Sequence, residues 1–337
     1  MGDIPSGANP FLECIDCIPE MNILHVENQA GVANQLAQAQ RRLGHHAVVM
    51  ETWFNTLSEP HDVEFYYTHG SLAADLRNAR AILRYAKDFD VIHLHGGMYW
   101  KRFDAVAIKL LLRKPMIVHY HGSETRDGYG MRYQFLADRK LVSRPDLLKW
   151  HPRARYVPNP VGEHPYCFDL NARPRVLHMA TNRKAKGTDL IEKCLKELEQ
   201  EGLDFEHVIL DRVPHPQAME ELFRSHILID QVIPPTGRLP SIIGVASLEA
   251  MAMGKVAIST FDEEYRRYYP GCPEVVIAPE ADALKRAVRN CVGDLSAMKE
   301  LGLKGREYVK GHHSADAIVK DVMATYEEAM FLRSSRV

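Results

Sequence analysis

The sequence has 337 residues, of which 46% are hydrophobic and 26% are charged, a composition typical of globular proteins with well-buried cores. Its net charge of −2 disfavours a general nucleic-acid-binding protein, and no apolar run approaches the ~18 residues that a membrane-spanning helix needs. The length predicts two domains.

Residues 1–20 precede the first strand pattern and are predicted to be a flexible N-terminal extension. They contain Cys14 and Cys17, the one close pair among six cysteines. This pair resembles half of a zinc site, but no second pair completes it. Because the segment also lacks the basic start and long apolar run of a secretory signal, we expect free thiols and a cytoplasmic protein.

A first series of strands and helices predicts an N-terminal domain over residues 21–168. Residues 32–43 read as a helix that ends at Gly44, and further helices are expected at 71–87 and near 101–113. Apolar runs that alternate with such helices are typical of a parallel sheet covered on both faces. The predicted strands are 23–27, 46–51, 63–68, 91–95, 116–120 and 154–157.

A proline-rich linker at 158–174 leads into a second series, which predicts a C-terminal domain over 169–315. A last helix in 316–337 is expected to cross back to the N-terminal domain. The expected fold class is therefore α/β, with two Rossmann-like doubly wound domains facing a cleft, where ligands bind beyond the carboxyl ends of the strands. The predicted strands are 175–179, 207–210, 227–232, 256–259 and 275–278, and the predicted helices are 188–201, 216–225, 245–253, 281–292, 296–310 and 315–332.

The turn at 28–32 follows a strand and opens a helix, a position where free backbone N–H groups attract anions. It contains only Gly31 and so lacks the three glycines of a dinucleotide-binding fingerprint, which disfavours an oxidoreductase. On this turn alone, a purely structural role in the tight connection is the favoured interpretation.

Four histidines lie at the ends of two predicted strands. His93 and His95 share one strand, and His119 and His121 continue from the next, so each pair projects to one face of the sheet. Two such pairs are compatible with a metal, but no carboxylate or cysteine accompanies them at ligand spacing, and we expect no metal. Contact with substrate suits the strand ends better, and a hydrogen-bonded structural role is the alternative.

The segment 181–189 places three cations where a helix begins, among them Arg183 and Lys186. This is the unfavourable sign for a helix N-terminus, and it is explained if a phosphate dianion normally occupies the turn. A solvated basic turn is an equally weighted alternative.

A third candidate is the helix start at 244–255, which follows a loop rich in proline and glycine. The amides of Gly244, Val245 and Ala246 are expected to bind phosphate. Glu249 would present a carboxylate to sugar hydroxyls, the alternative being a partner of the helix dipole.

Two features are interpreted as unrelated to catalysis. Asp88 and Asp90 match an Asp-x-Asp metal pattern, but they precede a strand and are predicted to cap a loop. No phosphate-binding Gly-x-x-x-x-Gly-Lys-Ser/Thr motif is present, so nucleoside triphosphate hydrolysis has no support.

Taken in order, these segments resemble glycosyltransferase family 4, whose members are retaining enzymes of the GT-B fold. The resemblance runs from about residue 21 to the C-terminus. It is carried by the Gly31 turn and by segments 90–96, 118–122, 156–161, 186–187 and 247–254.

The resemblance implies a role for each matching residue. Gly31 would face the donor phosphates or the acceptor, with His95 and Gly96 on the acceptor side, and His121 would lie near the transferred sugar. Lys186 with Arg183, or Asn182 in the place of Arg183, would neutralise the diphosphate. The amides of Gly244, Val245 and Ala246 would assist them, and Glu249 would bind the donor ribose.

The sequence departs from the family pattern at one glutamate, whose place is taken by Ser241. A catalytically degenerate binding or regulatory protein of the GT-B fold therefore remains an alternative, as does a sugar-nucleotide epimerase of that fold.

The resemblance implies a metal-independent, retaining hexosyltransferase in polysaccharide or glycoconjugate biosynthesis. Its donor would be a UDP- or GDP-linked sugar and its acceptor a glycan, a lipid-linked glycan or a small molecule; no cofactor and no nucleic acid are expected. Segment 101–114 has five basic residues, one acid and several leucines, so it is compatible with peripheral contact at the inner face of a membrane, although an ordinary packing helix is favoured.

Overall fold

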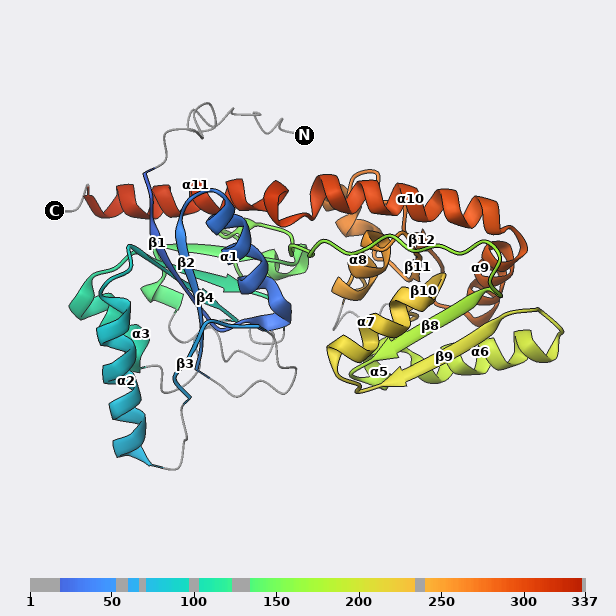
Figure 1. The fold of residues 1–337 in the computed structure, drawn as a ribbon, viewed down its shortest axis with the longest axis horizontal. Coiled ribbons are helices and arrows are strands. Elements are labelled where there is room, and N and C mark those ends of the chain that lie inside the picture. Colours follow the sequence, from blue (N-terminus) through green and yellow to red (C-terminus); the bar gives the residue numbers. More distant parts are fainter. Residues whose placement is uncertain are drawn as a thin grey trace. The chain divides into compact units, whose positions relative to one another are not determined.

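The computed structural model describes residues 19–52, 60–66, 71–96, 103–122, 134–233 and 240–334 (Figure 1). Nearly all of the predicted N-terminal extension lies outside these residues, as does the Cys14–Cys17 pair. The chain divides into two compact units. Unit 1 contains Met1–Pro158 and Ile318–Val337, and unit 2 contains Asn159–Ala317.

The sheet of unit 1 has the strand order β3-β2-β1-β4-β5-β6-β7, and every neighbouring pair is parallel, as the sequence predicts. The central strands β1, β2, β4 and β5 are largely buried, mainly apolar runs because helices cover the sheet. Their bounds are β1 (Asn22–Val26), β2 (His46–Glu51), β3 (Val63–Glu64), β4 (Val91–His95), β5 (Met116–Tyr120), β6 (Arg139–Val142) and β7 (Arg155–Tyr156).

The helices of unit 1 are α1 (Val32–Arg42), α2 (Leu72–Ala86), α3 (Phe103–Ala107) and α11 (Ala315–Ser334), whose part from Ile318 belongs to this unit. In α1, Val32, Leu36 and Ala39 recur at helical spacing and are fully buried or nearly so. The segment predicted as one helix near 101–113 changes at Ile108 from α3 into a π-helix (Ile108–Leu112).

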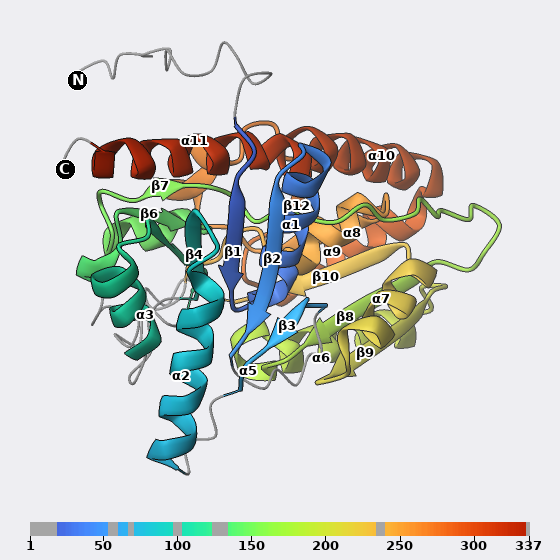
Figure 2. The ribbon, with the colours of Figure 1, turned by 60° about the vertical axis from the view of Figure 1, so that its left-hand side comes forward.

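Helix α11 is joined to the rest of unit 1 by polar contacts, among them those of Tyr326 and Glu328. The Tyr326 hydroxyl lies 2.7 Å from His93 Nδ1 and accepts a hydrogen bond from Gln40 Nε2 at 3.2 Å. Glu328 accepts hydrogen bonds from Arg139 Nε at 3.1 Å and Arg155 Nη2 at 2.5 Å. In Figure 2, α11 runs past the amino-terminal end of β1, close to α1.

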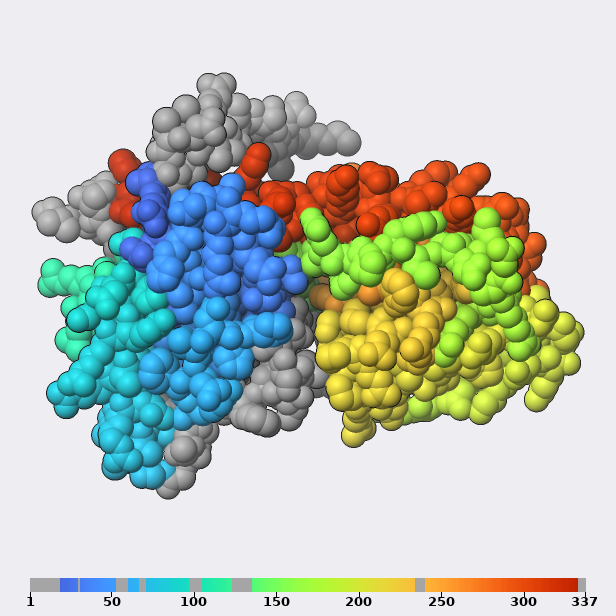
Figure 3. All heavy atoms as spheres, viewed as in Figure 1, coloured from blue at the N-terminus to red at the C-terminus, as the bar shows by residue number. Residues whose placement is uncertain are grey.

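Unit 2 has a second parallel sheet, in the order β12-β11-β10-β8-β9. In its covering helix α6, Ile191, Leu195 and Leu198 form a fully buried stripe. On the face of unit 2 shown in Figure 3, α7 (yellow) lies at the surface. The elements are β8 (Arg175–Ala180), α5 (Arg183–Lys186), α6 (Thr188–Gln200), β9 (Glu206–Asp211), α7 (His215–Arg224), β10 (Ile227–Gln231), α8 (Val245–Ala252), β11 (Val256–Ser259), β12 (Val275–Val276), α9 (Ala281–Gly293) and α10 (Leu295–His312).

Candidate functional site

In unit 2, the turn after β8 forms a short helix, α5, where the sequence predicted only a turn. Asn182 caps it by accepting a hydrogen bond from the Ala185 amide at 3.1 Å. The next glycine, Gly187, has φ +72°, and a Cβ there would lie 2.0 Å from the Val232 carbonyl oxygen. The Val232 amide donates to the Lys186 carbonyl at 3.0 Å. Only glycine therefore allows α5 to lie against the end of β10.

Asp230 on β10 connects Lys186 to the start of α8. Its side chain is fully buried, and its Oδ1 forms an ion pair with Lys186 Nζ, whose side chain is 26% exposed. Its Oδ2 accepts a hydrogen bond from Ser247 Oγ at 3.2 Å, and a Cβ on Gly244 would lie 2.4 Å from the same oxygen. Since β8 and β10 are parallel neighbours, Lys186 and the first turn of α8 share one edge of the sheet.

The N-terminus of α8 has no side-chain cap. Gly244 is its N-cap and contributes no side-chain hydrogen bond, and the first turn contains no acidic residue. The N–H groups that begin a helix lack partners within the helix and carry a partial positive charge. The amides of Gly244, Val245 and Ala246 are thus beside the Lys186–Asp230 pair.

Glu249 lies beyond the first turn of α8, so the simple dipole interpretation does not describe it. Its side chain is 10% exposed, and Oε1 forms a 2.9 Å contact with His215 Nε2. His215 is the first residue of α7, the helix that follows β9. The segments that follow the neighbouring strands β8 and β9 therefore both contribute residues to this edge of the sheet.

Arg183 and Ser241 have contacts elsewhere in unit 2. Arg183 Nη2 donates to Asp189 Oδ1 at 2.8 Å and to Glu192 Oε2 at 2.9 Å, both on α6. The Ser241 hydroxyl is buried, donates to the Thr260 carbonyl and accepts from Gln231 Nε2. The residue in place of the family glutamate is therefore part of the interior of the domain.

In unit 1, the structure brings the Gly31 turn close to Gly96. Gly31 has φ +70° and is the N-cap of α1, whose first turns are held by Asn28 Oδ1, which accepts from the Asn34 amide at 3.1 Å. Gly96 has φ +83°, and a Cβ there would lie within 2.8 Å of the Gln29 side-chain amide. Gly96 therefore packs against the Gln29 side chain at the carboxyl ends of β1 and β4.

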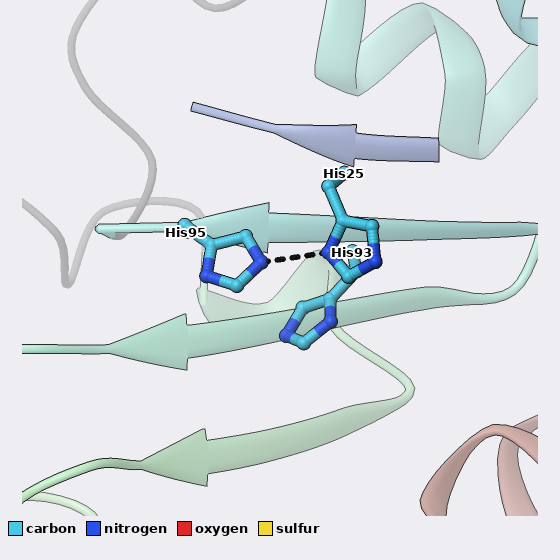
Figure 4. A group of neighbouring side chains, drawn as sticks. All are labelled: His25, His93 and His95. Atoms are coloured by element: carbon cyan, nitrogen blue, oxygen red, sulfur yellow. Dashed lines mark hydrogen bonds between the residues drawn. The ribbon is translucent and has the colours of Figure 1, made fainter. Parts of the chain in front are cut away.

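The four predicted histidines lie together, as their spacing predicts. His95 Nδ1 is 3.2 Å from His121 Nε2, and the rings of His93 and His119 are stacked at 5.4 Å. A fifth histidine, His25 on β1, joins them through its Nδ1, which is 2.9 Å from His95 Nε2 (Figure 4).

Burial determines the charge of this cluster. It lowers the pKa of His93, His95 and His119 well below the usual value, and the neighbouring imidazoles lower these pKa values further. Burial also lowers the pKa of His25 to about 4. The four side chains are therefore neutral at pH 7.

Sequence reasoning did not select Asp230, His215, His25, Gln40 or Tyr326. For Asp230 a signal was present, because an acid in the apolar run 227–232 needs a partner when buried. For the others, the partner comes from a different strand or helix, and spacing along the chain does not show it. Asp90 has the predicted capping role, because its Oδ2 accepts from the Asn22 amide at 2.8 Å.

Segment 101–114 lies partly outside the described residues, including Lys101 and Arg102. Within the described part, Lys109 forms an ion pair with Asp138, and Leu110 and Leu111 are 64% and 73% exposed. Among the helices that the structure describes, none combines the length and the apolar character needed to span a bilayer.

Comparison with known proteins finds similarity to glycosyltransferases, in sequence over part of the chain and in fold over most of it. Residues 29–157 match the family model described as Glycosyltransferase Family 4. No curated protein was found that matches the sequence.

Three similar solved structures cover almost the whole chain. Anabaena HepE in complex with UDP and glucose is 16% identical, with 91% of this chain and 100% of that chain covered and a TM-score of 0.64. A glycosyltransferase from Rickettsia africae is 16% identical, with 93% of this chain and 99% of that chain covered and a TM-score of 0.65. Sucrose-phosphate synthase from Thermosynechococcus elongatus is 14% identical, with 92% of this chain and 99% of that chain covered and a TM-score of 0.63.

Structural similarity at 14–16% identity is evidence for a shared fold, whereas the match to the family model is a similarity of sequence. Both agree with the resemblance inferred from the motifs. Residues 29–157 therefore match the model of Glycosyltransferase Family 4, and 91–92% of the chain shares the fold of these solved GT-B glycosyltransferases.

Proposed function

We propose that the protein transfers a hexosyl unit from a UDP- or GDP-linked sugar to a glycan, lipid or small-molecule acceptor, with retention of the anomeric configuration. The bond between the sugar and the diphosphate breaks, and the diphosphate leaves with the electron pair. The acceptor oxygen bonds to the same face of the sugar, and its proton passes to the leaving phosphate. The residues around the phosphate stabilise the negative charge on the departing diphosphate without a metal.

The arrangement around Asp230 is the observation that carries this proposal. Asp230 joins Lys186 to Ser247 in the first turn of α8, so one ammonium group and one uncapped helix N-terminus share an edge of the sheet. A diphosphate is the kind of ligand that such a pair of features binds, and a departing diphosphate gains most from them because its charge increases as the bond breaks.

The remaining residues are proposed to have the roles that the family resemblance implies. Glu249 is oriented by His215 and would accept hydrogen bonds from ribose hydroxyls. Arg183 would reach the diphosphate only by leaving Asp189 and Glu192, whereas Asn182 remains the cap of α5. In unit 1, His121 would contact the transferred sugar, with His95 and Gly96 on the acceptor side and Gly31 facing the donor phosphates or the acceptor.

The structural relatives support a uridine nucleotide. Anabaena HepE has been solved in complex with UDP-glucose as well as with UDP and glucose. UDP-glucose is therefore the first donor to test, with GDP-linked sugars as the alternative.

Binding is tested by calorimetric titration of UDP, GDP and their hexose derivatives into the full chain. Lys186→Ala and Glu249→Ala should each weaken binding at least about tenfold, because each removes a charged hydrogen-bonding group. Lys184→Ala, an exposed neighbour on α5, and Glu220→Ala, an exposed residue on α7, are matched controls and should bind as the wild type does. Equal affinity in Lys186→Ala and Glu249→Ala would remove the assignment.

Transfer is tested by NMR analysis of products from an acceptor panel, with and without added Mg²⁺ or Mn²⁺. A retained anomeric configuration and a rate that added metal does not change are expected. Inversion would contradict the proposed stereochemistry. Binding without any product would favour the non-catalytic alternative, which the buried structural role of Ser241 motivates. An epimerised nucleotide sugar would identify an epimerase.

We further propose peripheral contact with the inner face of a membrane through 101–114. Leu110 and Leu111 are exposed next to the basic residues Arg113 and Lys114, a combination that suits an anionic lipid surface. Co-sedimentation with anionic vesicles should be lost in Leu110→Ser/Leu111→Ser. Equal sedimentation of that variant, or equal binding to neutral vesicles, would contradict this contact.

A further inference from the structure

Three imidazoles on two neighbouring strands of unit 1 lie close together and away from solvent. His25 on β1 is the register partner of His93 on β4, and His95 follows two residues later on the same strand. All three are 0% exposed, and one ring nitrogen from each lies within 4.8 Å of the others. Figure 4 shows His95 and His25 facing each other, with His93 next to them.

Each of these imidazoles is held by a group outside the trio through its outer ring nitrogen. His25 Nε2 donates to Gln40 Oε1 at 2.8 Å, and His93 Nδ1 is 2.7 Å from the Tyr326 hydroxyl. His95 Nδ1 is 3.2 Å from His121 Nε2. Metal-binding histidines almost always have such a partner on the second nitrogen, because it fixes the ring and selects the tautomer.

The inner ring nitrogens are the ones that a metal needs. The Gln40 oxygen can only accept, so His25 Nε2 carries the hydrogen and Nδ1 presents its lone pair to the trio. His25 Nδ1 and His95 Nε2 lie 2.9 Å apart. His93 Nε2 is buried and has no hydrogen-bond partner among the residues that the structure describes. A buried polar atom without a partner in a polar cluster calls for an explanation.

We propose that His25, His93 and His95 bind a first-row transition-metal ion of the kind that imidazole prefers, with Zn²⁺ as the expected occupant. In a tetrahedral zinc site with Zn–N bonds of about 2.05 Å, ligand nitrogens lie about 3.3 Å apart. The 2.9 Å contact between His25 and His95 would open by a few tenths of an ångström, and the His93 nitrogen, which lies within 4.8 Å of the other two, would settle at the same spacing. A small solvent ligand would complete the coordination.

The chemistry of the ligand set selects the metal class. Imidazole suits zinc, cobalt, nickel and copper, whereas Mg²⁺ and Ca²⁺ require oxygen ligands that the trio lacks. Burial keeps the three side chains neutral, which is the ligand form, and their second nitrogens connect the site to α1 and α11. The ion would therefore stabilise unit 1. This inference goes beyond the proposed sugar transfer. The two proposals share His95, which as a zinc ligand would hold the ion at the acceptor side.

A second trio, His95, His119 and His121, has similar spacing but fits less well. It shares His95, so one ion in each trio would require a bridging imidazole. His121 is only partly buried, and no side chain holds His119 through either ring nitrogen in the described part of the chain. This trio supplies the control that distinguishes the two positions.

The test measures metal in the full chain, purified without a histidine tag from medium that contains zinc. We expect about one zinc ion per chain by mass spectrometry, and a Zn X-ray absorption spectrum with scattering from three imidazoles. That spectrum requires no variant, so it tests the site even if substitution prevents folding. A wild-type protein that contains no zinc and gains no thermal stability from added Zn²⁺ or Co²⁺ would overturn the proposal.

Two matched substitutions locate the ion. His93→Gln should reduce the zinc content at least about tenfold, whereas His119→Gln, which changes a buried neighbour, should retain it. Gln40→Ala should weaken zinc binding by about tenfold to a hundredfold, because it removes the group that orients His25 and donates to the Tyr326 hydroxyl but leaves the three ligands in place. Retention of zinc in His93→Gln, or its loss in His119→Gln alone, would refute this site.

Discussion

Lys186 and Asp230 form an ion pair in which the two partners are unequally exposed. The Asp230 side chain is fully buried on β10, whereas the Lys186 side chain is 26% exposed after β8. The carboxylate therefore depends on the ammonium group, but the ammonium group can also be solvated or can bind an incoming anion. This inequality leaves the Lys186 ammonium group accessible to solvent while Asp230 fixes its position.

Removal of Lys186 should destabilise the protein more than removal of the charge on Asp230. Lys186→Met leaves a buried carboxylate without its cation and should lower the free energy of unfolding by ~3 kcal/mol. Asp230→Asn leaves an ammonium group that reaches water and should lower it by only ~1 kcal/mol. Urea denaturation of both variants measures this, with Lys184→Met as a control. A larger effect of Asp230→Asn would contradict the stated dependence.

Gly187→Ala should be far more disruptive than Gly202→Ala, although both glycines have positive φ. A Cβ on Gly202 would meet no described atom within 4 Å, so this substitution introduces only backbone strain of ~1–2 kcal/mol. At Gly187, the new Cβ would also meet the Val232 carbonyl oxygen at 2.0 Å and force α5 away from β10. We expect Gly187→Ala to lose at least ~2 kcal/mol more, together with nucleotide affinity. Equal melting temperatures would argue against this packing.

Glu274 should make the protein less stable as the pH rises. Burial raises its pKa to about 7, from a usual value of 4.5. The folded state therefore binds this proton more tightly than the unfolded state, and stability falls between about pH 4.5 and pH 7. The difference of about 2.5 pKa units corresponds to ~3 kcal/mol.

The variant Glu274→Gln should remove this pH-dependent loss. Its stability relative to the wild type should therefore increase between pH 5 and pH 8. Chemical denaturation at the two pH values measures the difference, and Glu280→Gln, at an exposed position, is the control. A constant difference between Glu274→Gln and the wild type would show that Glu274 does not titrate in this range.

Tyr326→Phe should destabilise unit 1 through one lost hydroxyl group. That hydroxyl is buried and contacts His93 Nδ1 and Gln40 Nε2, which would both lose a partner. We expect a loss of ~2 kcal/mol in the free energy of unfolding. Tyr85→Phe, at a half-buried position, should change it by less than ~0.5 kcal/mol. Similar melting temperatures for both variants would indicate that Tyr326 acts only through its ring.

The sequence predicted most of the secondary structure because buried parallel strands are short apolar runs. The strands His46–Glu51, Val91–His95, Met116–Tyr120 and Val256–Ser259 have the predicted bounds. Strand β6 was missed, since Arg139 and Lys140 at its start give no apolar run. Helix α5 was missed because four residues are too few to show helical spacing.

The candidate site could be predicted only in part. The cation at Lys186, the glycines at Gly187 and Gly244 and the carboxylate at Glu249 stand in local patterns that follow strands. Their partners Asp230 and His215 come from other strands and helices. The local sequence around Arg183 did not determine its contacts either. It was compatible with a contact to phosphate as well as with the contacts to the acids of α6 that the structure shows.

The sequence by itself determined the alternation of strands and helices and which side chains of one strand share a face, because backbone geometry sets those periods. The tertiary structure alone decided that His25 lies opposite His93 and that Asp230 meets Lys186. Strand order and register set these pairings. Strand order and register in turn depend on how whole sheets and helices bury their apolar faces against one another. Residues far apart in the chain contribute to that burial together.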